Sequence, residues 1–242
     1  MCTVTFIPSK QKIFLTSNRD EKHWRAAASF PEAYPAQTGK IIFPKDGDAG
    51  GTWFAVHENG NAVVFLNGGF VKHTPQPPYR KSRGLILLDV VDRESPLQAF
   101  QEIDLENIEP FTAVIWEKAK LNECRWTGSE KHQSPLAEDV PHIWSSATLY
   151  DAEVVIKRRN WFQQWLEEHP HPSQEEILDF HQFTGDGDEH NDLVMNRDGK
   201  VFTVSVTSAL IGEDKIVLEY VDVKQALTKE RDFPIINASI KA

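Results

Sequence analysis

The order of strand-like and helix-like segments is the feature that most constrains how this chain can fold. Short runs rich in β-branched and aromatic residues fill the first 67 residues, helical periodicity follows in two groups, and strand-like runs return near the C-terminus. Because the helical segments are grouped and do not alternate with single strands, we predict an α+β fold and not a doubly wound parallel sheet. The 242 residues can bury a sizeable core, and we expect one domain over residues 1–242.

The first two strand-like runs predict a β-hairpin. Residues 2–7 and 12–17 have strand composition, and the residues between them, Pro8-Ser9-Lys10-Gln11, have turn composition. Further strands are predicted from similar runs bounded by turn residues. These runs are residues 40–43, 52–56, 62–66, 112–117, 121–126, 192–195, 200–208 and 215–221.

Helical periodicity predicts the helices of the chain. The segments are residues 82–93, 96–103, 151–168 and 173–183. In the third segment most apolar residues share one broad face, and Arg158 lies on that face with them. The fourth segment opens with Ser173 and Glu176 at the spacing of a capping box.

Charge and cysteine content limit the possible functions. A formal net charge of −10 without runs of basic residues argues against a nucleic-acid partner. The two cysteines do not form a disulfide pattern, which predicts a reducing, cytoplasmic compartment. The longest apolar stretch, residues 84–91, is far shorter than the roughly 20 residues that cross a bilayer. The sequence has no zinc-binding pattern, so we expect no metal. It gives no indication of oligomeric state.

Cys2 is the first candidate for chemistry. If Met1 is removed, Cys2 becomes the terminal residue, and its α-amine, with a pKa of about 8, is a base beside its own thiol. One residue then supplies both nucleophile and base. If Met1 is retained, the amine belongs to Met1 and this mechanism is lost. The alternative is a small, often buried cysteine without a chemical role.

The tetrapeptide Asn18-Arg19-Asp20-Glu21 follows the second run of the predicted hairpin. Because antiparallel pairing returns the end of the second strand to the beginning of the first, we expect the tetrapeptide beside Cys2. Alternation along a strand gives Asn18 and Asp20 one face, and Arg19 and Glu21 the other. A carboxylate there would orient the amine, and a guanidinium would favour the thiolate. The alternative is an ion pair at the end of a strand.

Asn67 is a third candidate. It closes the apolar run 63–66 and precedes Gly68 and Gly69, which allow backbone N–H groups to approach a ligand. An amide in this position is a plausible oxyanion donor for acyl transfer. The alternative is an ordinary Asn-Gly turn.

Several motifs of the chain form a recognisable set. They are Met1-Cys2, Asn18-Arg19-Asp20-Glu21, Gly50-Gly51-Thr52-Trp53, Val64-Phe65-Leu66-Asn67-Gly68 and Ser82-Arg83-Gly84. Together they resemble the NRDE family, also called the transport and Golgi organisation 2 (TANGO2-like) family. The resemblance is specific to about residue 90 and continues more weakly to about residue 221. It implies the fold of the amino-terminal-nucleophile hydrolases, a four-layer αββα sandwich of two antiparallel sheets flanked by helices.

The resemblance also implies roles for individual residues. In the related conjugated bile acid hydrolases and penicillin V acylases, the terminal cysteine attacks an amide. This implies Cys2 as nucleophile and general base, Arg19 and Asp20 around its amine and thiol, and Asn67 in the oxyanion hole. Asn18 and Ser146 are the implied substrate-binding residues.

The chain departs from those enzymes in three places. Arg19 and Asp20 are adjacent here, whereas the acylases space the corresponding residues three apart. Ser146 stands where relatives typically have asparagine, and residues 201–208 contain no arginine where relatives have one.

Two hypotheses for the function follow. The first is a cysteine hydrolase that cleaves a linear amide bond through an acyl-thioester at Cys2. The second is a non-catalytic binding or trafficking protein for a hydrophobic ligand, of the haem or lipid type, because eukaryotic members of the family are associated with haem mobilisation and lipid homeostasis. The departures at Ser146 and in residues 201–208 favour the second hypothesis.

Overall fold

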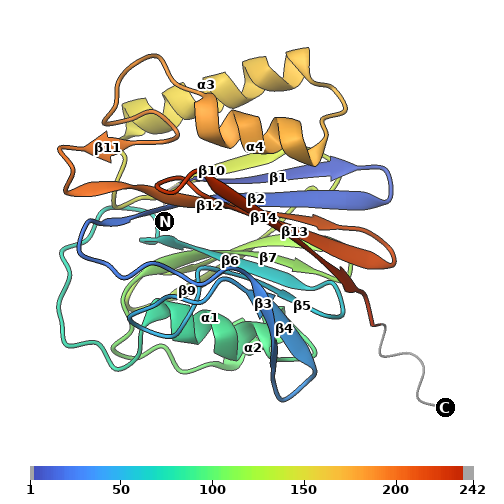
Figure 1. The fold of residues 1–242 in the computed structure, drawn as a ribbon. Coiled ribbons are helices and arrows are strands. Elements are labelled where there is room, and N and C mark those ends of the chain that lie inside the picture. The colour runs from blue at the N-terminus through green and yellow to red at the C-terminus, as the bar shows by residue number, and fades with distance from the viewer. Residues whose placement is uncertain (1–2, 237–242) are drawn as a thin grey trace.

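A computed structural model describes residues 3–236, which form two antiparallel β-sheets packed face to face between two layers of helices (Figure 1). The first sheet has the strand order β10-β1-β2-β12-β13-β14, with β11 paired to β12. Its strands are β1 (Thr3–Ser9), β2 (Lys12–Lys22), β10 (His142–Ser145), β11 (Asn196–Arg197), β12 (Val201–Ile211), β13 (Lys215–Asp222) and β14 (Leu227–Pro234).

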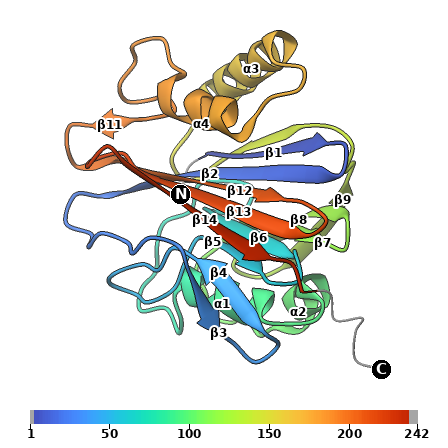
Figure 2. The same cartoon turned by 45° about the vertical axis from the view of Figure 1, so that its right-hand side comes forward.

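The second sheet follows chain order from β3 to β9. Its strands are β3 (Glu32–Pro35), β4 (Lys40–Phe43), β5 (Phe54–His57), β6 (Ala62–Asn67), β7 (Phe111–Glu117), β8 (Lys120–Trp126) and β9 (Lys131–Leu136). Helices α1 (Arg83–Val91) and α2 (Pro96–Glu102) cover its outer face, and α3 (Ala152–Glu168) and α4 (Gln174–Phe183) cover the first sheet (Figures 1 and 2). This arrangement confirms the predicted α+β, αββα fold.

The hairpin of β1 and β2 has the register that positions the site. Val4 pairs with Ser17 and Ser9 with Lys12, so the beginning of β1 lies beside the end of β2. Side chains alternate along β1, where Val4 and Phe6 enter the core between the sheets and Ile7 packs in the cluster under α3 and α4. Each of the two strands therefore presents one face to the partner sheet and the other to the helices.

The predicted helices agree with the structure to within a few residues. Ser173 and Glu176 form both hydrogen bonds of the capping box, and the side chain of Asp151 caps α3 by accepting from the Val154 N–H. No helix among residues 3–236 combines the length and the apolar character that a membrane crossing requires.

The prediction of a strand over residues 192–195 was wrong, because strand pairing begins only with β11 at Asn196. The sequence interpretation also missed β3, β9 and β14. These strands lie at edges of the sheets, where one side of the backbone has no partner strand. Edge strands tolerate proline and charge, and all three of these strands contain both.

Candidate active site

A cavity of about 350 Å³ lies between the two sheets, at the edge where β2 and β6 end. Its wall combines the end of β2, the loop from residue 46 to residue 53, the end of β6, and the segment that leads into α1. The lining residues are Arg19, Glu21, Arg25, Asp46, Ala49, Gly51, Thr52, Trp53, Phe65, Asn67, Tyr79, Lys81, Ser82, Arg83, Gly84 and Glu109. The cavity thus brings two predicted site residues, Arg19 and Asn67, to one place.

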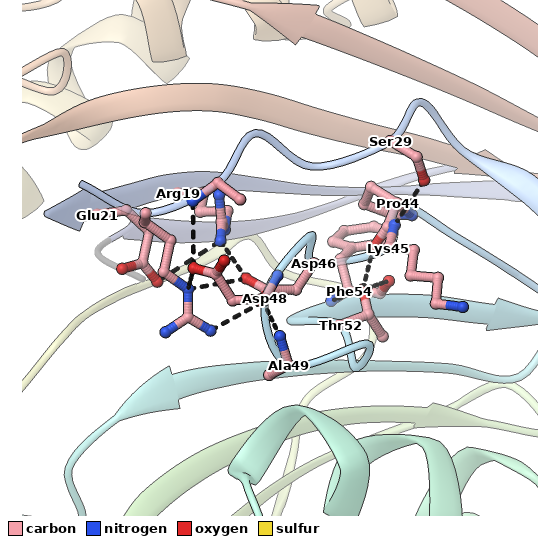
Figure 3. Close-up of polar contacts among 12 residues, drawn as sticks. Arg19, Glu21, Ser29, Pro44, Lys45, Asp46, Asp48, Ala49, Thr52 and Phe54 are labelled. Atoms are coloured by element: carbon pink, nitrogen blue, oxygen red, sulfur yellow. Dashed lines mark hydrogen bonds and ion pairs between the residues drawn. The ribbon is translucent and has the colours of Figure 1, made fainter. Parts of the chain in front are cut away.

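Arg19 crosses from the first sheet to the second. Its guanidinium lies 4.4 Å from the ring centre of Trp53, and it forms an ion pair with Asp46 (Figure 3). A second carboxylate, Glu21, lies 3.7 Å away, on the same face of β2. Both side chains line the cavity, as the predicted alternation along β2 requires.

Asp46 interacts with two arginines and two backbone N–H groups at the cavity wall. Besides Arg19, it pairs with Arg25 at 2.9 Å and accepts the backbone N–H groups of Asp48 and Ala49. Burial alone would raise the pKa of the Asp46 carboxyl, but Arg25, the Ala49 N–H and Arg19 together hold this pKa below its ordinary value. Asp46 is therefore ionised at neutral pH and fixes both guanidinium groups.

The loop that carries Asp46 is closed by its own hydrogen bonds. The Asp46 N–H donates to Gly51 O at 2.8 Å, and the Thr52 hydroxyl contacts Pro44 O at 2.7 Å and Phe54 O at 2.9 Å (Figure 3). Gly50 adopts a φ of +66°, a conformation that other residues rarely adopt. These contacts explain why a Gly-Gly-Thr-Trp motif follows the aspartate.

Two glycines allow close contact between the third and fifth motifs of the set, Gly50-Gly51-Thr52-Trp53 and Ser82-Arg83-Gly84. A Cβ on Gly84 would lie 2.8 Å from Thr52 O, and a Cβ on Gly51 would lie 2.5 Å from the carbonyl carbon of Gly84. The Thr52 N–H also donates to Gly84 O at 3.3 Å. The start of α1 therefore packs backbone to backbone on the segment that carries Trp53.

Replacing Gly84 by alanine is expected to destabilise the fold by about 1–3 kcal/mol, because the added methyl group meets backbone and not a movable side chain. Chemical denaturation of the two proteins measures the difference. Gly212→Ala is the control, since a Cβ there has no neighbour closer than 3.5 Å. Equal stability of the Gly84→Ala variant and the unmodified protein would contradict the close backbone contact.

Asn67 and Ser146 also come together. Ser146 follows β10 of the first sheet, is completely buried, and donates its hydroxyl to Asn67 O at 3.0 Å. Its hydroxyl further contacts the Thr148 hydroxyl at 3.0 Å. Ser146 thus ties the end of β6 to the first sheet, whereas the residues that line the cavity include Asn67 and not Ser146.

Asn18 lies on the opposite face of β2 from Arg19. Its side-chain amide donates to the main-chain oxygens of His181 and Leu193, and its side-chain oxygen contacts His181 Nδ1. The other ring nitrogen of His181 contacts the Thr5 hydroxyl at 2.7 Å. Burial and, to a smaller extent, Arg158 lower the pKa of His181 to about 3, so the ring is neutral. This network anchors α4 to the first sheet.

Asp20 shares the helix-facing side of β2 with Asn18 and is almost fully buried. It accepts the hydroxyl of Tyr150 at 2.9 Å and that of Thr203 at 2.6 Å. The guanidinium of Arg158 stacks 3.7 Å from the ring centre of Tyr150. A register shift between Thr203 and Ser205, opposite this part of β2, interrupts the regular pairing.

Arg158 links this cluster to the first described residue of β1. It is completely buried in α3 and donates to the Thr3 hydroxyl and to the main-chain oxygens of Asn191 and Asp192. No carboxylate among residues 3–236 forms an ion pair with it. A buried guanidinium therefore holds the beginning of β1 and, through Tyr150, lies close to Asp20.

The nucleophile predicted from the sequence, Cys2, lies outside the described residues. The other cysteine, Cys124, is completely buried in β8. Burial, with a smaller contribution from Glu123, raises the pKa of the Cys124 thiol to about 12. Cys124 is therefore unreactive at neutral pH.

Several residues of the site were not predicted as such from the sequence. Asp46 was not singled out among the turn residues that bound the predicted strands, and Arg158 was interpreted as one member of a helix face. Trp53 and Arg83 entered only as parts of motifs. No local pattern in the sequence distinguishes Asp46 from its neighbour Asp48, and Arg158 stands out only as an arginine among apolar residues on its helix face.

Comparison with known proteins gives a family match for most of the chain. Residues 1–206 match the model of the family described as "Transport and Golgi organisation 2". None of the curated proteins compared matches the chain.

Solved structures share the fold. An N-acylethanolamine-hydrolyzing acid amidase ortholog from Caenorhabditis elegans has 12% identity and a TM-score of 0.59, covering 86% of this chain and 92% of its own. A conjugated bile acid hydrolase from Clostridium perfringens matches in two forms, both 10% identical and covering 96% of this chain and 92% of their own. The TM-score is 0.61 for the cysteine-to-alanine mutant and 0.63 for the arginine-to-leucine variant.

Proposed function

Because the chain belongs to the transport and Golgi organisation 2 family and shares the fold of amino-terminal-nucleophile hydrolases, we propose that it cleaves a linear amide bond with Cys2 as nucleophile. The observation that carries this proposal is the cavity that holds Arg19 and Asn67 at the edge where β1 begins. In β1, Val4 and Phe6 face the partner sheet. Cys2 precedes this strand in the sequence, and the proposed chemistry requires its thiol to act at this cavity.

The proposed reaction has two steps. The thiol of Cys2 attacks the amide carbon, the new C–S bond forms, and the C–N bond breaks. The α-amine of Cys2 takes the thiol proton and passes it to the leaving nitrogen, and water then hydrolyses the thioester and regenerates the thiol. Asn67 donates to the oxyanion, and the guanidinium of Arg19 favours the thiolate. Asp20 orients the amine from the helix-facing side.

The charged wall of the cavity favours this proposal over the binding of haem or lipid. Seven charged side chains line a space of about 350 Å³. Burying a hydrophobic ligand against them would remove ion pairs from water without compensation. The haem or lipid hypothesis, the absence of a nucleic-acid partner and the cytoplasmic location stay predictions from the sequence.

Two measurements on the purified protein test the proposal. The intact mass should show a chain without Met1. An iodoacetamide-type probe at pH 8 should then label Cys124→Ala and leave Cys2→Ala unlabelled, because the pKa of Cys124 is about 12. Equal labelling of the two variants, or an intact mass that includes Met1, would contradict the proposal.

Replacing Thr3 by valine is expected to lower kcat about tenfold, because it removes the contact through which Arg158 holds the residue next to Cys2. The matched control is Thr5→Val, which removes a buried contact to His181 on the same face of β1. Both changes should cost about 1–3 kcal/mol of stability. Only Thr3→Val should also shift the pH profile of kcat. Equal effects of the two variants on that profile would assign Arg158 a purely structural role.

A further inference from the structure

We infer that the cavity binds an oxyanion, a carboxylate or a phosphate, at the N-terminus of α1 beside Arg83. For the hydrolase proposed above, this defines the substrate class as amides that carry such a group. The naming of a substrate rests on the proposed function, whereas anion binding itself needs no catalysis.

The first observation is the open N-terminus of α1. This helix has nine residues, and its first two, Arg83 and Gly84, line the cavity together with the N-cap Ser82. The N–H groups of Arg83 and Gly84 have no hydrogen-bond acceptor in the described part of the chain. Free N–H groups at the positive end of a helix favour an anion.

The side chains near the start of α1 are positively charged, whereas negative charge at the N-terminus stabilises an isolated helix. The first turn has no acidic residue, and Arg83 is the first residue of the helix, preceded by Lys81. A cation at the positive end of the helix dipole is unfavourable by itself. A bound anion would reverse the sign of this interaction.

Arg83 is only partly compensated by its neighbours. It pairs with Glu109 at 3.1 Å and donates to Pro110 O at 3.2 Å, but Glu109 also contacts His73 at 3.3 Å. Burial lowers the pKa of Arg83 more than Glu109 and the more distant Glu21 raise it. An additional oxyanion would stabilise the guanidinium.

An independent observation is the unpaired indole of Trp53. The side chain lines the same cavity and is 5% exposed, and its N–H has no acceptor in the described residues. The backbone contact of Thr52 with Gly84 brings this segment to the start of α1. Because a buried donor without an acceptor is unfavourable, a ligand oxygen that accepts from it would be favoured.

The other charged groups of the wall are already paired. Asp46 is shared by Arg19 and Arg25, and Glu21 lies beside Arg19. Lys81 pairs with Asp89, which does not line the cavity. The groups without a full set of partners, namely the N–H groups of Arg83 and Gly84, the Arg83 guanidinium and the Trp53 indole, are all hydrogen-bond donors. They therefore favour a ligand that is rich in acceptors.

Calorimetric titration with glutarate and with inorganic phosphate tests the site without turnover, in the Cys2→Ala background. Arg83→Gln should weaken binding at least about tenfold, the size of a lost charge-assisted contact. Arg80→Gln is the matched control, because it removes the same charge three residues earlier in the chain. The side chain of Arg80 is 46% exposed and does not line the cavity. Trp53→Phe, which keeps the ring over which Arg19 stacks, should weaken binding several-fold. Comparison of the two anions identifies the preferred group.

A matched pair of substrates separates this inference from the proposed function. Glutaryl-4-nitroanilide and pentanoyl-4-nitroanilide differ by one carboxylate, and kcat/KM should favour the first at least about tenfold. Arg83→Gln should remove the preference, and Arg80→Gln should retain it. Cleavage without preference, absence of binding by both anions, or equal weakening by Arg83→Gln and Arg80→Gln would overturn the inference. Anion binding without cleavage of either anilide would support the site and contradict the hydrolase.

Discussion

Replacement of Cys2 by alanine is expected to reduce kcat for amide hydrolysis by about 10⁴-fold or more, because no other group of the chain can form the thioester. The melting temperature should change by only a few degrees. Steady-state assays with the preferred nitroanilide measure the rate, and thermal unfolding measures the stability of both proteins.

Cys124→Ala is the control for this experiment. Its thiol is buried, with a pKa of about 12, and the structure gives it no access to the cavity. Its kcat should stay within about twofold of the unmodified protein, although the loss of buried volume costs some stability. Residual turnover of Cys2→Ala close to that of Cys124→Ala would exclude the proposed nucleophile.

Replacement of Asp46 by asparagine is expected to lower the free energy of unfolding by about 3–5 kcal/mol, because it leaves the guanidinium of Arg19 buried without its closest anion. In a chain of this size, that corresponds to a fall in Tm of roughly 10 °C. Urea denaturation at pH 7 measures the change. Asp48→Asn is the matched control, since Asp48 is 48% exposed and lies 3.5 Å from Arg25, so its loss should cost about 0.5 kcal/mol or less.

The same carboxylate contributes to the pH dependence of stability. The pKa of Asp46 in the folded protein lies below its ordinary value of 3.8. The folded state therefore binds its proton less readily than the unfolded state, and the stabilisation is fully present above pH 4 and is lost as the pH falls through the lowered pKa. Between about pH 2 and pH 5 the stability of Asp46→Asn should change less steeply than that of the unmodified protein. Parallel curves would show that Asp46 is not held by its cationic partners.

The parts of the fold that could be predicted are those whose signal is local. The hairpin of β1 and β2 and the capping box of Ser173 and Glu176 depend on neighbouring residues, and both are confirmed. The edge strand β14 could not be predicted, because most of its side chains are exposed and no alternation of apolar residues marks it. Its pairing depends on β13 alone.

The same distinction applies to the site. Alternation along β2 correctly predicted that Arg19 and Glu21 share a face. Asn67, which was singled out because it closes an apolar strand, lines the same cavity, and its catalytic role stays a prediction. Asp46 could not be identified, since its role arises from guanidinium groups 21 and 27 residues away in sequence. Nor could the burial of Arg158 be predicted, because its partners Thr3 and Asn191 come from segments that meet only in the folded chain.

The most direct test of a terminal Cys2 nucleophile is mass spectrometry of the protein mixed with glutaryl-4-nitroanilide and quenched in acid within the first turnover. We predict a chain without Met1 that carries one glutaryl group on the peptide that begins at Cys2. Hydroxylamine should remove this group, because hydroxylamine cleaves thioesters. A chain that turns over the anilide with no such adduct, or with the group on another residue, would contradict the account.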